Sequence, residues 1–224
     1  MKSNLFIPIV LMLAIQLVSC GQNELNSGIT ESKGIVSKGT GTLLSTTTTN
    51  NLTQSEINGL FLMREEEKMA QNVYEKFYEA FGITNFDVIS NSETRHAEAI
   101  LNLINHFGLT DPALKDAGMF SNQVIQTLYN QLIASGTSAN AALNTGAYIE
   151  EYDIRDLKRL IAETTNTEIM QVYTNLLDGS KNHLRAFANV LANQGIVYSP
   201  QILSSEDFDA IITGTNTAPN GKWK

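Results

Sequence analysis

The sequence predicts an all-α protein, a four-helix bundle with one long crossover connection. Apolar residues recur at steps of three and four over four long segments, which is the period of an amphipathic helix. Capping residues precede these segments, and glycine ends several of them. Short turns join the first segment to the second and the third to the fourth, whereas about thirty residues separate the second from the third.

Residues 1–20 have the pattern of a bacterial lipoprotein signal peptide. An apolar stretch over 5–18 follows Lys2 and is too short to span a bilayer comfortably. It leads into the tetrapeptide LVSC, which matches a lipobox and ends at Cys20, the only cysteine in the chain. We expect cleavage before Cys20 and lipid attachment to its sulfur, which would place the protein in the bacterial cell envelope, anchored to a membrane surface. The alternative is ordinary secretion with an unmodified cysteine.

Residues 21–53 are rich in Asn, Ser, Thr and Gly and show no apolar periodicity, so we expect a flexible tether. The bundle is expected over 54–197. Its first helix begins at a capping box, Thr53 with Glu56, and ends at Phe81 before Gly82. The apolar stripe of this helix is interrupted near its middle by Glu67.

The second helix is expected from about residue 85 to 107, and its stripe is interrupted by Glu93 and His96. The crossover that follows has the pattern of a shorter amphipathic helix over 122–133. The third helix, over 138–164, has Glu150 on its stripe.

The fourth helix, over 167–193, has Ser180 and His183 on its stripe. The tail, 198–224, has one short helical candidate at 205–212 and either packs on the bundle or hangs free.

Each long helix therefore places a polar group where its pattern requires a core residue. An isolated buried carboxylate costs several kcal/mol, so four such interruptions at mid-bundle call for a compensating partner, of which a metal ion is the simplest. Glu93 and His96 are spaced i, i+3, which lets both reach one ion. Carboxylate and imidazole ligands without thiolate suit iron, manganese or zinc.

The residues leave some assignments open. Glu66 replaces Glu67 if the first helix is rotated, and Glu151 competes in the same way with Glu150. His106 is one step off its stripe near the end of the second helix and is interpreted as a surface or capping residue. Two tyrosines on inward stripes, at 74 and 173, either bond a ligand, serve in electron transfer or pack as core aromatics, and packing is the preferred interpretation.

Four stretches together resemble the di-iron ferritin-like superfamily, which includes the rubrerythrins. They are REEEK at 64–68, SETRH at 92–96, IEEYDI at 149–154 and GSKNHL at 179–184. Within it, they resemble an uncharacterised domain family over about residues 55–200. The resemblance implies a ferritin-like bundle and two ions of iron or manganese, with dioxygen, peroxide or iron as small-molecule partners. Rubrerythrins also have a cysteine module for electron delivery; this chain has none, so redox turnover would need an external electron donor.

The chain departs from the superfamily pattern at Ser180, where the resemblance implies a glutamate. Asp153, one turn after Glu150, is a candidate replacement, and otherwise the site holds a single ion. The expected metal ligands are thus Glu67, Glu93, His96, Glu150, Asp153 and His183.

Two functions follow from these expectations, and a third is weaker. The first is a metal-binding lipoprotein for oxygen, peroxide or iron redox chemistry. The second is a lipid-anchored binding or structural module with a mononuclear or vestigial site. Iron storage in a closed shell is disfavoured by a membrane tether on every subunit. The net charge of −8 without a basic cluster makes nucleic acid an unlikely partner.

Overall fold

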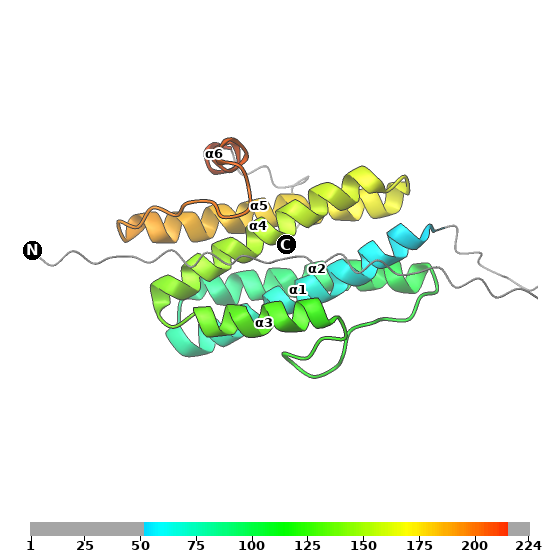
Figure 1. The fold of residues 1–224 in the computed structure, drawn as a ribbon, viewed down its shortest axis with the longest axis horizontal. Coiled ribbons are helices and arrows are strands. Elements are labelled where there is room, and N and C mark those ends of the chain that lie inside the picture. Colours follow the sequence, from blue (N-terminus) through cyan, green and yellow to red (C-terminus); the bar gives the residue numbers. More distant parts are fainter. Residues whose placement is uncertain (1–51, 215–224) are drawn as a thin grey trace, which may run out of the picture. The chain divides into compact units, whose positions relative to one another are not determined.

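The computed structural model describes residues 52–214, and within this range every regular element is a helix (Figure 1). Cys20, the expected signal peptide and most of the expected tether lie outside the described residues. The helices are α1 (Gln54–Phe81), α2 (Thr84–His106), α3 (Gln123–Ser135), α4 (Ala139–Glu163), α5 (Thr167–Asn193) and α6 (Ser205–Thr213). Among the described residues, no helix has the length and apolarity needed to cross a bilayer.

The ends of α1 show how local sequence sets a helix boundary. The Thr53 side chain accepts a hydrogen bond from the backbone N–H of Glu56, and the Glu56 carboxylate accepts one from the backbone N–H of Thr53 at 2.9 Å. The expected capping box is therefore confirmed. At the other end Gly82 adopts a left-handed conformation (φ 64°), which a residue with a Cβ rarely tolerates.

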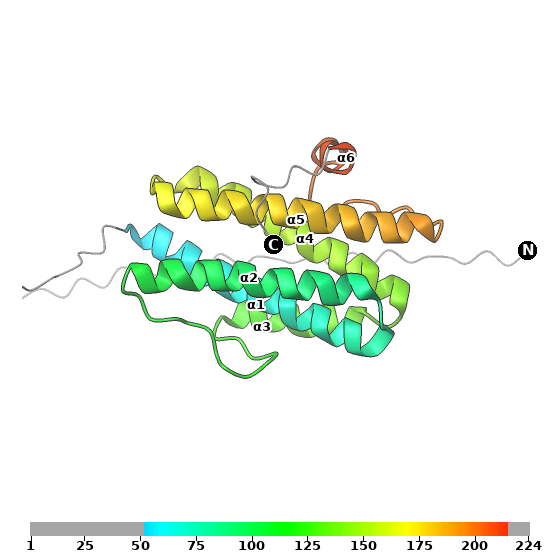
Figure 2. The ribbon, with the colours of Figure 1, turned by 180° about the vertical axis from the view of Figure 1, so that it is seen from behind.

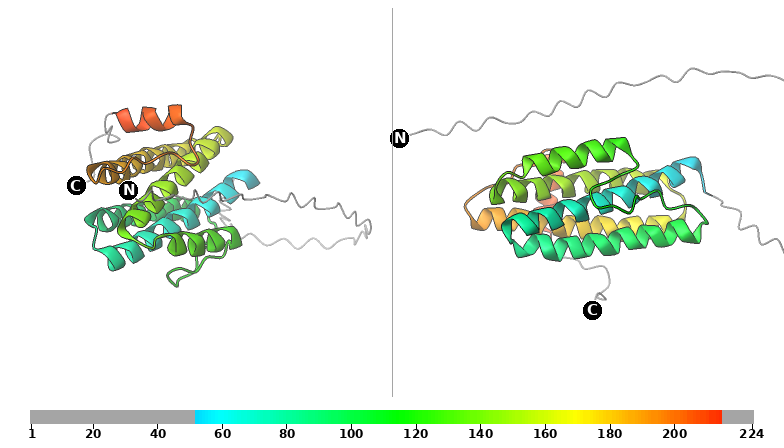
Figure 3. Two further views of the ribbon diagram at one scale, coloured as in Figure 1. Left: turned by 60° about the vertical axis from the view of Figure 1, so that its left-hand side comes forward. Right: turned by 90° about the horizontal axis from the view of Figure 1, so that it is seen from below.

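The four long helices form the expected bundle with one long crossover. Helices α1 and α2 form one hairpin, and α4 and α5 form the other. The hairpins meet with α1 beside α4 and α2 beside α5. Helix α3 lies outside the bundle against α1 and α4, whereas α6 lies against α5 (Figures 1 and 3).

The core at one end of the bundle is aromatic. Tyr74 packs against Phe86 and Phe187, with ring centroids 6.0 and 5.3 Å apart, and all three side chains are fully buried. Burying one large apolar side chain contributes about 1.5–3 kcal/mol, so this cluster ties α1, α2 and α5 together. Gly146 of α4 makes room for the Phe187 ring, because a Cβ there would lie 2.8 Å from it.

Several buried acidic residues are fully hydrogen-bonded and hold the fold together. Glu65 accepts hydrogen bonds from the backbone N–H and hydroxyl of Ser121 and from the backbone N–H of Asn122, which fixes the start of α3 on α1. Glu56 accepts a bond from the Thr164 hydroxyl at 2.7 Å besides closing its capping box. Hydrogen bonds from protein donors replace those that water would make to these carboxylates, so they need no further partner.

Glu151 attaches the C-terminal segment to α4. Its carboxylate accepts hydrogen bonds from the Tyr198 hydroxyl and from the backbone N–H groups of Gln201, Ile202 and Leu203, at 2.5–3.1 Å. Tyr198, Phe208 and Ile211 are buried in the core. Of the two outcomes considered for the tail, the described residues 198–214 therefore pack on the bundle.

The substitution Glu151→Ala should lower the free energy of unfolding by about 2–4 kcal/mol, because it leaves buried N–H donors without an acceptor. Urea unfolding followed by circular dichroism measures this. Glu163→Ala is the matched control, since its carboxylate is exposed and accepts hydrogen bonds from Arg159. Equal stability of the two variants would contradict the role assigned to Glu151.

Candidate metal centre

Three consecutive glutamates of α1 point in three directions. Successive helical residues are rotated by about 100°, so Glu65 faces α3, Glu66 faces α4 and Glu67 faces α2. All three are buried because α1 is covered by α2, α3 and α4. Of the three, Glu67 reaches His96 of α2.

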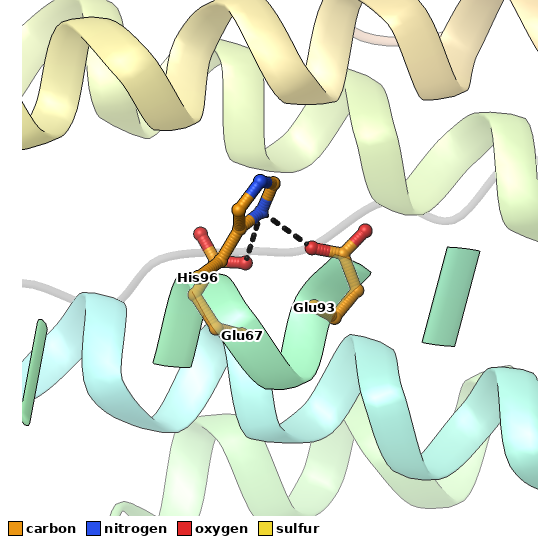
Figure 4. Close-up of side chains that lie close together, drawn as sticks. All are labelled: Glu67, Glu93 and His96. Atoms are coloured by element: carbon orange, nitrogen blue, oxygen red, sulfur yellow. Dashed lines mark hydrogen bonds and ion pairs between the residues drawn. The ribbon is translucent and has the colours of Figure 1, made fainter. Parts of the chain in front are cut away.

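The first group of converging side chains consists of Glu67, Glu93 and His96. Nδ1 of His96 lies 2.7 Å from Oε2 of Glu93 and 3.3 Å from Oε2 of Glu67 (Figure 4). The i, i+3 spacing places Glu93 and His96 on one face of α2, and Glu67 comes from the partner helix of the same hairpin. Figure 4 shows both carboxylates directed at the same ring nitrogen.

The second group consists of Glu93, Glu150 and His183. Nδ1 of His183 lies 2.7 Å from Oε1 of Glu93 and 3.5 Å from Oε2 of Glu150. Glu93 therefore belongs to both groups and uses a different oxygen in each. The two imidazole rings stack beside it, with centroids 5.5 Å apart.

The contacts of Glu93 are close but are poor hydrogen bonds. Although His183 Nδ1 lies 2.7 Å from Glu93, neither this nitrogen nor the Glu93 oxygens have a hydrogen-bond partner of acceptable geometry. In each group one ligand atom per residue lies within 4.8 Å of the others. Ligands about 2.0–2.2 Å from a shared ion lie about 3 Å or more apart, so each group is compact enough to converge on one ion once its 2.7 Å contact opens slightly.

The carboxylates of this centre differ from the structural ones because they have buried oxygens that no hydrogen-bond donor reaches. Among the described residues, eight carboxylate oxygens are buried and make no hydrogen bond; they belong to Glu66, Glu67, Glu93, Glu150 and Asp153. Glu56, Glu65 and Glu151, in contrast, have donors around them. A buried carboxylate without a donor is costly, so the central five are the ones that call for cations.

Glu93 is the strongest acid of the centre. Burial alone would raise the pKa of Glu93, but the positive charges of His183 and His96 outweigh it and hold the pKa well below the usual range. Burial opposes charging of the histidines as well. The carboxylates of Glu93 and Glu150 nevertheless raise the pKa of His183 to about 10, and Glu93 with Glu67 raises that of His96 well above its usual value.

The remaining carboxylates hold protons tightly. Burial raises the pKa of Glu67 to about 8, against the opposing charge of His96. Burial and the neighbouring carboxylates Glu67 and Glu150 raise the pKa of Asp153 well above its usual value. The pKa of Glu150 is raised by burial and by the charge of Glu93. In the absence of a cation, protons thus reduce the negative charge of the centre.

Tyr74 supports Glu150. Its hydroxyl donates to Oε1 of Glu150 at 2.5 Å, and the Gly146 carbonyl lies 3.3 Å away. Two of the three sequence interpretations of this tyrosine agree with these contacts, since it packs in the aromatic core and also bonds a candidate ligand. Its role in electron transfer stays a prediction. Such a partner fixes the orientation of the carboxylate and leaves the other oxygen, Oε2, to face His183.

Asp153 has unpartnered oxygens, whereas the hydroxyl of Ser180 is already hydrogen-bonded. Asp153 is fully buried and both of its oxygens lack partners, but it lies outside the two converging groups. Its strongest charge interactions are with Glu67 and Glu150, one from each group. Ser180 is fully buried and donates to the Leu176 carbonyl of its own helix at 3.1 Å.

Glu66 is more deeply involved in the core than its sequence position predicts. The sequence offers it as a substitute for Glu67, whereas in the structure it is fully buried with both oxygens unpartnered, and burial together with the charge of Asp156 raises its pKa. The apolar stripe could not reveal this, because the stripe follows one face of α1. The crossover helix and α4 cover the other faces, so a run of three glutamates there is buried on every side.

The chain matches the family described as "Uncharacterized protein domain (DUF2202)" over residues 56–215. It belongs to this family. The matched range of the DUF2202 chain begins in the first turn of α1 and continues through α6, so it includes both converging groups.

The DUF2202 chain is also similar to an archaeal protein, "Uncharacterized protein MJ0754" of Methanocaldococcus jannaschii. The two are 40% identical over 166 residues, which cover 73% of this chain and 90% of the relative. A solved structure, "Crystal structure of hypothetical protein MJ0754 from Methanococcus jannaschii DSM 2661", superimposes with a TM-score of 0.72 at 40% identity, covering 74% of this chain and 95% of that one.

The metal-free DUF2202 chain should lose stability as the pH rises from 6 to 9. Folding raises the pKa of Glu67 from 4.5 to about 8 and that of His183 from 6.5 to about 10. The stabilisation by these protons is fully present below the unfolded values and is lost as the pH passes the folded values. At about 1.4 kcal/mol per pKa unit, the loss amounts to several kcal/mol. Folding lowers the pKa of Glu93, so its contribution to stability has the opposite pH dependence and is lost only in acid.

Urea unfolding in the presence of a chelator at pH 6, 7.5 and 9 measures this slope. Glu67→Gln should flatten it, because the amide holds no titrating proton. Glu163→Gln changes an exposed carboxylate and should leave the slope as it is. Stability that rises with pH over this range would show that protons do not compensate the buried carboxylates.

Proposed function

We propose that the chain is a ferritin-like metal-binding protein that holds two ions of iron or manganese between its hairpins. The observation that supports this most directly is Glu93, which belongs to two converging groups and offers one oxygen to each. A carboxylate placed in this way suits a bridge between two ions. Carboxylate oxygens with imidazole nitrogens form a ligand set for iron or manganese, and the ferritin-like superfamily uses such sets in bundle cores.

The residues fit two ions better than one. Glu67 and His96 would hold one ion and Glu150 and His183 the other, and Glu93 belongs to both groups. We assign Asp153 to the position that the missing helix-4 glutamate would take, since its charge interactions extend to both groups. The Ser180 hydroxyl is engaged with its own helix and is not assigned as a ligand.

Bound iron or manganese would supply redox chemistry toward dioxygen, peroxide or ferrous iron. The chain contributes position and electrostatics: Tyr74 orients Glu150, the buried carboxylates offset the cationic charge, and the surrounding core excludes bulk water. Sustained turnover needs an external electron donor, because the only cysteine is Cys20 at the expected lipidation site.

The full-length chain expressed with iron or manganese should contain about two ions per chain by elemental analysis, as expected for a carboxylate-bridged pair in a bundle core. The double substitution Glu93→Ala, His96→Ala should abolish binding because it removes the shared carboxylate. Asp153→Asn should weaken it. Affinity should rise with pH, since the ligands must lose protons to bind.

The matched control is His106→Ala, Glu168→Ala. It removes a pair of the same residue types, 3.3 Å apart and 60% exposed, that lies outside both converging groups. Dioxygen or peroxide added to the iron(II) protein should oxidise the iron, which absorption spectroscopy detects. One inert ion per chain would favour the alternative, a lipid-anchored binding or structural module. No metal in the parent chain would refute the proposed metal function.

We further propose that the protein is exported and lipid-anchored through Cys20. Support comes from the sequence of residues 1–20 alone. In a bacterial host, labelled palmitate should be incorporated into the parent chain, and Cys20→Ala should abolish the label and release the protein from the membrane fraction. Ser19→Ala keeps a small residue before the cleavage position and should remain labelled. A labelled Cys20→Ala variant would refute the anchor.

A further inference from the structure

A pocket of about 210 Å³ lies between α2 and α5 and reaches the histidines from outside the bundle. Figure 2 shows the face on which these two helices run beside each other. His96 and His183 line the pocket, and their side chains retain 14% and 12% of their exposure. The carboxylates of the two converging groups are fully buried and do not line it.

The pocket is lined by hydrogen-bond donors and has no acidic residue. Besides the two histidines, its polar side chains are Ser92, Arg95, Asn175 and Asn182. Each of these can donate a hydrogen bond, and Arg95 brings a fixed positive charge. A pocket with one fixed positive charge and no Asp or Glu in its lining favours an anion over a cation.

The histidines present a defined edge to this pocket. Their Nδ1 atoms face the carboxylates, so Nε2 lies on the opposite edge of each ring. When Nδ1 binds a cation, the ring proton is on Nε2, which then donates. Figure 4 shows the second nitrogen of His96 directed away from both carboxylates. Gly179 of α5 leaves this edge open, because a Cβ there would lie 2.7 Å from Nε2 of His96.

The rest of the wall is apolar and includes Ala99, Val172 and Leu176. A cavity of about 150 Å³ accommodates benzene, so this pocket has room for a ligand of about six non-hydrogen atoms. Dioxygen or peroxide alone would leave most of it unfilled. The walls therefore suit a ligand with one anionic end and a short apolar end.

We propose that this pocket binds a small monocarboxylate. The carboxylate accepts hydrogen bonds from Arg95 and from the side-chain amides of Asn175 and Asn182, and its alkyl end contacts Val172 and Leu176. The site extends beyond the proposed metal function, because Arg95 and the two asparagines donate hydrogen bonds with or without a metal ion. It places an organic anion on the outer edge of the imidazoles, separated by one ring from the buried carboxylates.

Calorimetric titration of the full-length chain with butyrate tests this, in chelator and again after loading with redox-inert zinc. Butyrate should bind at one site per chain, and butylammonium, of similar size and opposite charge, should bind at least about tenfold more weakly, since a charge-assisted hydrogen bond contributes about 1.5–3 kcal/mol. Arg95→Gln should weaken butyrate binding by about the same factor. Arg159→Gln, which makes the same charge change on α4, should not weaken it.

A second pair of variants tests location. Val172→Trp fills the pocket and should abolish butyrate binding, whereas Val88→Trp adds the same ring at a position 59% exposed and should not. Circular dichroism on each variant verifies folding. Equal affinity for butyrate and butylammonium, or unchanged binding in both Arg95→Gln and Val172→Trp, would overturn the inference.

Zinc content measured on the same samples separates this inference from the proposed function. Butyrate binding to a chain that takes up no zinc supports the pocket, and the elemental analysis with iron or manganese described above then decides the metal centre separately. A zinc-loaded chain that binds no butyrate overturns the pocket and leaves the metal centre standing.

Discussion

The carboxylate of Glu93 lies 2.7 Å from a histidine nitrogen on each side, and the arrangement of the bundle core depends on this double contact. Glu93 is on α2, which belongs to the first hairpin, whereas His183 is on α5, which belongs to the second. The charges of the two imidazoles overcome the burial that would otherwise protonate this carboxylate. The electrostatics of the centre therefore join the two hairpins, in addition to the apolar packing around Tyr74.

Buried acidic residues in this chain fall into two physical groups. Glu56, Glu65 and Glu151 receive hydrogen bonds from backbone and hydroxyl donors and hold distant segments in place. The central carboxylates have unpartnered oxygens and sit beside imidazoles or one another. Composition cannot separate the groups, because both consist of glutamates at buried helical positions. The two groups differ in whether hydrogen-bond donors reach both carboxylate oxygens. By this criterion the adjacent residues Glu150 and Glu151 belong to different groups.

Much of this structure follows from local sequence. Thr53 with Glu56 and Gly82 fix the ends of α1, and the interruptions of the apolar stripes indicated the residues that the two groups bring together: Glu67, Glu93, His96, Glu150 and His183. What periodicity could not supply were contacts set by distant segments. The environment of Glu66 depends on α4, and that of Glu151 depends on residues 198–203. Asp153 was expected as a ligand, but its part in metal binding stays a prediction.

The two groups differ in how much of the chain must fold before each can assemble. Glu67, Glu93 and His96 all belong to the α1–α2 hairpin, so a short loop closure brings them together. Glu93, Glu150 and His183 come from both hairpins, and the long crossover with α3 must close before they meet. One half of the centre is thus encoded within a single supersecondary unit, whereas the other half exists only in the completed tertiary topology.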